Sequence, residues 1–110
     1  MPRPKQIRLL SDIIPIRWSA QDIATASRKE GEPLYGLYHD GEIILDPGVR
    51  QQPDTLLHEI LHALISKTGM AEQGGILHGE AEEQMVQALT PLLLHVLREN
   101  PALVRFLVER

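Results

Sequence analysis

The first half of the chain contains short apolar segments with the two-residue alternation that is typical of β-strands. Residues 13–18 form the first, and Pro15 indicates an edge position because proline cannot donate a hydrogen bond to a neighbouring strand. Two further apolar segments, at 34–38 and 42–45, flank Asp40-Gly41. This dipeptide is typical of the tight turn of a β-hairpin, which requires positive φ. We therefore expect one strand followed by a paired hairpin.

The other segments carry the end signals of helices. Ser19 followed by Asp22 resembles a capping box, with Asp in place of Glu. Pro53 favours the first turn of a second helix, and Pro91 predicts a kink within a third. Asn100-Pro101 is typical of the start of a fourth helix. The expected helices span residues 20–29, 53–68 and 80–99, followed by a short terminal helix from residue 101.

The order of these elements predicts an α+β fold, in which a small antiparallel sheet packs against the helix at 53–68 and a C-terminal helix. Pro2 and Pro4 oppose regular structure at the N-terminus, so we expect a flexible tail over residues 1–10. A chain of 110 residues fits one domain, which is then expected over residues 11–110.

Composition narrows the classes of function. The formal net charge of −4 argues against a nucleic-acid-binding protein, which normally presents a clustered basic face. The chain has no cysteine, so a transition-metal site would have to use imidazole and carboxylate ligands. No apolar run approaches the roughly 18 residues of a membrane span, and the first residues lack the pattern of a secretory signal. We therefore expect a cytoplasmic protein that binds neither membranes nor nucleic acid.

One segment of the helix at 53–68 carries the residues of a metal centre. His58 and His62 are four residues apart, so both imidazoles lie on one helix face and can reach one ion. Glu59 lies one position round the helix, where a carboxylate can deprotonate a metal-bound water. The alternative is that the two histidines only meet polar partners at a packed surface. Their setting on a helix with an apolar face favours a Zn²⁺ site.

A catalytic zinc site needs a third protein ligand, and the helix at 80–99 offers the best candidates. Its expected buried stripe passes through Met85 and Val86. Glu82 points along the middle of this stripe, whereas Glu83 lies toward its flank. A carboxylate directed into a core is costly unless a cation compensates its charge. Glu82 is therefore the first choice as third ligand, and Glu83 is the second.

Five other side chains are weaker candidates. His78, in a glycine-rich segment, could swing to the metal or toward a substrate carbonyl, but a solvent-facing position is the simpler expectation. His95 is expected to be a packing residue, and His39 a solvated residue of the hairpin tip. Tyr35 and Tyr38 could each donate a hydrogen bond to an oxyanion near the metal, although strand packing also explains them.

These segments resemble minimal, gluzincin-like zincin metallopeptidases, and in particular small phage and mobile-element proteins related to the ImmA/IrrE metallopeptidase families. The likeness rests on LLHEILHAL at 56–64, EEQMVQAL at 82–89 and the LREN-PAL ending, and it covers roughly residues 34–107. The first motif is specific, and the second is a weak acidic-then-apolar pattern. No Gly-x-x-His follows the first motif, which excludes a metzincin.

The resemblance implies a zincin-like fold with His58, His62 and Glu82 as zinc ligands and Glu59 as general base. It also implies that the strand before the HExxH helix forms the substrate-binding edge of the sheet. The Asp or Asn that usually follows the ligand Glu by four residues is replaced by Val86. The resulting hypothesis is a zinc-dependent peptidase that acts on a peptide or protein substrate.

The alternative hypothesis is a non-catalytic, zinc-stabilised module of phage or mobile-element origin that binds a partner protein. A fourth protein ligand such as His78 would favour this module, whereas an open coordination position would favour catalysis.

Overall fold

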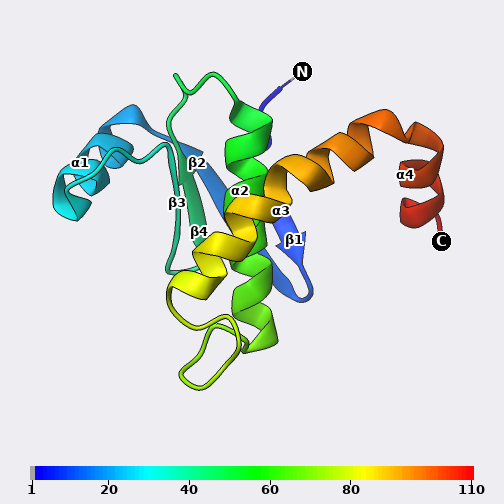
Figure 1. Ribbon diagram of the computed structural model, residues 1–110. Helices are drawn as coiled ribbons and strands as arrows, with labels where there is room; N and C mark the ends of the chain where they lie inside the picture. The colour runs from blue at the N-terminus through cyan, green and yellow to red at the C-terminus, as the bar shows by residue number, and fades with distance from the viewer. Residues whose placement is uncertain (1) are drawn as a thin grey trace.

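The computed structural model describes residues 2–110 and shows an α+β architecture, which confirms that prediction (Figure 1). In chain order the elements are β1 (Gln6–Leu9), β2 (Asp12–Trp18), α1 (Ala20–Glu30), β3 (Gly36–His39), β4 (Glu42–Leu45), α2 (Gln52–Thr68), α3 (Glu80–Glu99) and α4 (Pro101–Val108). α1 lies on one side of the sheet, and α2 and α3 lie on the other (Figure 1). Within residues 2–110, none of the helices combines the length and the apolar character that a membrane crossing requires.

The four strands form one mixed sheet in the order β1-β2-β4-β3. β1 and β2 pair antiparallel, as do β3 and β4, but β2 and β4 pair in parallel. The expectation of a purely antiparallel sheet is therefore wrong. After β2, the chain passes through α1 and a loop to β3, which lies at the edge of the sheet. β4 then lies between β3 and β2.

The hairpin prediction is confirmed at its turn. Asp40 and Gly41 have φ angles of 50° and 74°, which is the left-handed region that this turn requires. His39 pairs with Glu42 directly across the turn. The second strand has the expected bounds, and the first begins at Gly36, two residues later than expected.

The segment before β2 belongs to the sheet, so the expectation of a flexible tail through residue 10 is wrong for β1. Ile7 and Leu9 pack against the core. The Trp18 indole N–H also donates a hydrogen bond to the Pro4 carbonyl at 3.0 Å. Pro2 and Pro4 precede β1, so they do not interrupt its hydrogen bonds to β2. Ile7 and Leu9 are two residues apart and therefore face the same side of the sheet, which favours a strand here.

β2 is an interior strand and not the edge strand that Pro15 indicated. Pro15 pairs with Gln6 of β1, whereas the pairing with β4 begins only at Ile16. The proline therefore lies where β2 has a neighbour on one side only, and its missing N–H costs no ladder bond on the other side.

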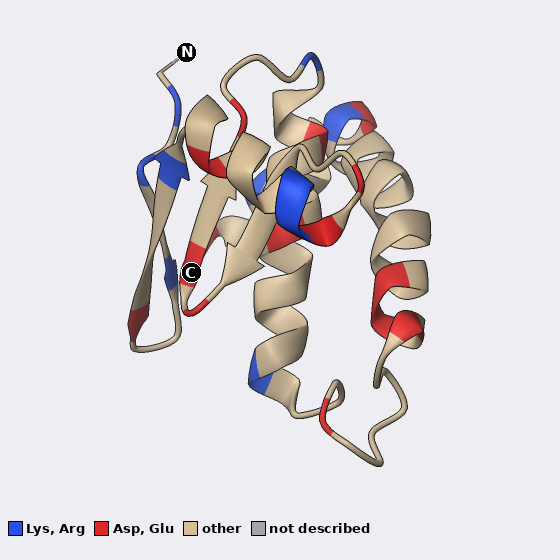
Figure 2. Ribbon diagram, turned by 90° about the vertical axis from the view of Figure 1, so that its left-hand side faces the viewer, with Lys and Arg blue, Asp and Glu red and all other residues tan. Residues whose placement is uncertain are grey.

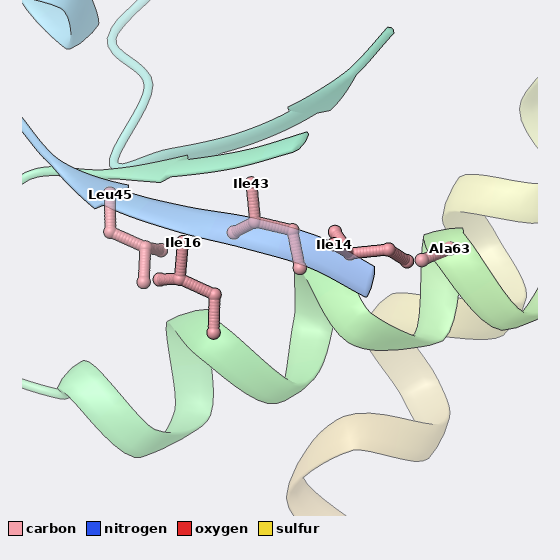
Figure 3. Packing of buried hydrophobic residues seen from close by; sticks show 5 residues of the cluster. All are labelled: Ile14, Ile16, Ile43, Leu45 and Ala63. Carbon is pink, nitrogen blue, oxygen red and sulfur yellow. The ribbon is translucent and has the colours of Figure 1, made fainter. Parts of the chain in front are cut away.

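The core lies between the sheet and α2. The side chains of Ile14, Ile16, Ile43 and Leu45 extend from the strands toward α2, where Ala63 meets them (Figure 3). All five are buried. Full burial of an aliphatic side chain of this size stabilises a fold by about 1.5–3 kcal/mol. This packing determines where α2, and with it the HExxH segment, lies.

Candidate metal centre

α2 is oriented by its apolar face and therefore presents the HExxH histidines on another face. Leu56 and Ile60 pack against the core, and Ala63 is fully buried in it. His58 and His62 contact carboxylates of α3, which packs against α2. The helical spacing therefore brings both imidazoles into the space between the two helices.

The two histidines and Glu83 converge on one point. The Nε2 atoms of His58 and His62 lie 3.3 Å apart. The Glu83 carboxylate contacts both, with 3.0 Å from Oε1 to Nε2 of His58 and 2.8 Å from Oε2 to Nε2 of His62. A tetrahedral zinc ion with ligands about 2 Å away separates its donor atoms by about 3.3 Å. The arrangement has the donor types and the compactness of a three-ligand zinc site.

Glu82 completes this arrangement from the other side of the His62 ring. Its carboxylate contacts Nδ1 of His62, while Nε2 faces His58 and Glu83. A carboxylate at Nδ1 favours the tautomer that carries its proton there, and Nε2 in that tautomer can bind a metal at the shared point.

The carboxylate that groups with both Nε2 atoms is therefore that of Glu83, the second candidate for third ligand, and not that of Glu82, the first candidate. Glu82 does point inward as expected, since its side chain is 22% exposed against 46% for Glu83. The difference comes from the rotation of α3. Its buried face passes through Val86 and Thr90, while Met85, expected on the buried stripe, is exposed. This rotation brings Glu83 to the Nε2 atoms and Glu82 to the back of the His62 ring.

Gln87 supports the carboxylate of Glu83. Its amide Nε2 donates a hydrogen bond to Oε1 of Glu83 at 3.2 Å, from one helical turn further along α3. The residue four positions after Glu82 is Val86, which is apolar. The residue four positions after Glu83 is Gln87, which is polar. Gln87 restricts the rotation of the carboxylate that contacts both histidines.

Glu59 is the buried acid of the centre. Its side chain is only 7% exposed, and the Tyr38 backbone N–H donates a hydrogen bond to it. Burial is the main cause that raises the pKa of Glu59 to about 7, and the charge of Glu83 adds to it, while His62 and the Tyr38 N–H oppose the shift. Burial also lowers the pKa of His58, which favours the neutral imidazole that binds metals.

Gly36 is a positioning residue that the sequence reasoning missed. A Cβ at this position would lie 2.8 Å from the Leu45 side chain, 2.9 Å from that of Thr55 and 3.2 Å from Cγ of Glu59. The absent side chain lets β3 approach α2 where Glu59 lies between them. A glycine inside a strand is the available signal, because it often marks a close approach of two backbones.

The remaining candidates lie away from this cluster. His78 contacts the Ala71 carbonyl through Nδ1 at 3.0 Å, so it belongs to the loop before α3. His95 is exposed on α3, and His39 contacts Asp40 at the exposed hairpin tip. The Tyr38 hydroxyl lies 3.4 Å from Ser66 Oγ. Within residues 2–110, the group of side chains that could hold a metal has three members, His58, His62 and Glu83.

Two adjoining cavities open beside the cluster, with volumes of about 530 Å³ and 460 Å³. Both are lined by His58, Glu59 and Glu83, together with Gly36 of β3 and Gln87 of α3. The candidate metal position and the buried acid therefore face space that a substrate segment could enter. Tyr35 of the loop before β3 lines the larger cavity.

Comparison with known proteins found no matching family model, no matching curated protein and no matching solved structure.

Proposed function

We propose that this protein is a zinc-dependent peptidase of the minimal zincin type, with His58, His62 and Glu83 as zinc ligands. The observation that carries the proposal is the convergence of the two Nε2 atoms and the Glu83 carboxylate, with a buried glutamate beside them. Three protein ligands leave one coordination position open, which is typical of catalytic rather than structural zinc. The HExxH motif on α2 supports the same assignment.

The chemistry follows from the positions of these side chains. Zinc held by His58, His62 and Glu83 would supply a Lewis acid for the scissile carbonyl and would make the attacking water more acidic. Glu59 lines both cavities. There it would accept the proton of the attacking water and later return it to the leaving amine. Glu82 contacts Nδ1 of His62 and would hold the ring with Nε2 free to bind the metal. Tyr35 lines the cavity and remains the candidate donor to an oxyanion, because the Tyr38 hydroxyl is directed to Ser66.

A second candidate function is the non-catalytic module, in which zinc mainly fastens α3 to α2 and the protein acts by binding a partner. α3 favours this candidate, since its 20 residues include only two buried ones, Val86 and Thr90. A metal that joined the two helices would contribute folding free energy that this packing does not supply.

Glu59→Gln separates the two functions. Gln keeps the size and the helix propensity of Glu but cannot accept the proton. We expect zinc stoichiometry to be unchanged and cleavage of a peptide library to fall by roughly 10²–10⁴-fold, the usual contribution of a general base. The measurement is product formation by mass spectrometry, with zinc content determined on the same samples. Zinc-loaded wild type that cleaves no peptide would favour the binding module, and equal cleavage by Glu59→Gln would place the activity elsewhere.

A further inference from the structure

The charged side chains that line the two cavities beside the candidate metal centre are mainly acidic. Six carboxylates line them, and no Lys or Arg is among their lining residues; the six are Glu30, Glu32, Asp54, Glu59, Glu82 and Glu83. Four of these have explained roles or partners: Glu59, Glu82 and Glu83 belong to the centre, and Asp54 meets Arg98 at 3.5 Å. The other two, Glu30 and Glu32, are exposed at the end of α1 and in the loop after it.

Glu32 stands where both cavities meet. It lines the larger one together with Asp54, Thr90 and Pro91, and the smaller one together with Glu30 and Glu82. A segment that filled both cavities would therefore come close to Glu32. On the opposite wall, acidic residues occupy the first turns of α3 (Figure 2). Binding of a divalent cation by the centre would neutralise only part of this charge, so the entrance would remain acidic.

Apolar side chains line part of the larger cavity beside the carboxylates. Pro33, Leu34 and Tyr35 line the larger cavity directly after Glu32, and Pro91 lines it from α3. Tyr35 is 57% exposed and lines the larger cavity, so a ligand can reach this residue. A Lys or Arg side chain has the matching composition, because its aliphatic stem packs on apolar surface while its charged end reaches a carboxylate. An aromatic face adds an attraction for the cation.

We propose that this cleft selects peptide segments that carry Lys or Arg beside the bond to be cleaved, with Glu32 and Glu30 as the residues that recognise the cationic side chain. The inference rests on the peptidase proposed above and adds the class of substrate to it. Three features support it together: the convergent candidate metal ligands, the cavities beside them, and a lining that has six carboxylates, no Lys or Arg, and apolar side chains next to Glu32. Acidic peptides are disfavoured by the same charges.

The test compares binding of three fluorescently labelled alanine–serine peptides of equal length that carry two Arg, two Ala or two Glu at the centre. The proteins are the zinc-loaded wild type, the double variant Glu30→Gln/Glu32→Gln, and Glu72→Gln as the matched control. Glu72 lies in the loop between α2 and α3 and lines neither cavity. Zinc content is measured on every sample, and cleavage of the same peptides is followed separately.

We expect wild type to bind the Arg peptide roughly five- to tenfold more tightly than the Ala peptide, as two exposed ion pairs would contribute, and the Glu peptide most weakly. The preference should shrink with added salt, fall below about twofold in the double variant and persist in Glu72→Gln. Equal binding of the Arg and Ala peptides, binding of none of them, or a preference that the double variant retains would overturn the inference. Preferential binding of the Arg peptide without cleavage of any peptide would overturn the peptidase and leave the charge selection of the cleft standing.

Discussion

α2 and α3 contribute side chains to the same candidate metal centre, but they are held in different ways. α2 packs one face against the sheet, with Leu61 and Ala63 buried and further apolar residues against the core. α3 is longer and buries only Val86 and Thr90. The two histidines therefore lie on a helix that the core positions, whereas Glu83 lies on a helix that few buried side chains hold in place. Metal binding is expected to matter most for the order of α3.

Removal of the metal is expected to have the largest effect on the difference in stability between α2 and α3. A ligand that binds only the folded state stabilises it by about 4 kcal/mol at a free concentration of roughly 1,000 times its dissociation constant. A chelator should therefore lower the melting temperature of the zinc-loaded protein and accelerate backbone hydrogen exchange in α3 more than around Ala63 of α2. His62→Ala is the control, because a chelator should change nothing in it. Equal acceleration in both helices would contradict the difference that we draw between them.

The neighbouring acids Glu82 and Glu83 offer a sharper test at single-residue level. Glu83→Ala removes a proposed ligand, so zinc affinity should fall by more than the 10- to 100-fold that is typical for loss of a residue behind a ligand. Glu82→Ala removes only the partner of His62 Nδ1, so its effect should lie within that range. Affinities are obtained by competition with a chromophoric chelator. A larger effect of Glu82→Ala would make Glu82 the ligand and would show that α3 is rotated differently.

The smallest expected effect concerns the contact of α2 with β3. Gly36→Ala places a Cβ within 3.2 Å of three side chains, so it should destabilise the protein by about 1–3 kcal/mol, as overpacking usually does. Gly48→Ala in the loop after β4 is the matched control, since its Cβ would meet only Asp46 Oδ1 at 3.4 Å. Urea unfolding of both variants measures the difference. A Gly36→Ala protein as stable as the control would show that β3 does not need this close approach.

Local signals in the sequence predicted much of the fold. Asp40-Gly41 predicted the hairpin, and Ser19 predicted the start of α1, where its Oγ accepts a hydrogen bond from the Asp22 N–H at 3.1 Å. The pairing of β2 with β4 could not be predicted in this way. It joins segments separated by α1 and β3, and neither strand carries a residue pattern that distinguishes a parallel neighbour from an antiparallel one.

The part of the candidate site that lies on α2 could be predicted from the sequence. His58, Glu59 and His62 share a helix whose apolar face is plain from the sequence, and the structure brings them together with a carboxylate of α3. The choice between Glu82 and Glu83 depends on the rotation of α3. The apolar stripe of that helix was a poor guide to its rotation, because Met85 and Leu89 are exposed while Thr90 is buried.

The metal content of the protein tests the central claim most directly. The purified chain is supplied with zinc, freed of unbound metal and subjected to elemental analysis, with His58→Ala and His62→Ala treated in parallel. We expect about one zinc ion per chain in wild type and a loss of stoichiometric zinc in both variants, because each variant leaves only two of the three ligands. A wild-type protein without transition metal after this treatment, or variants that retain zinc as well as wild type does, would contradict the account.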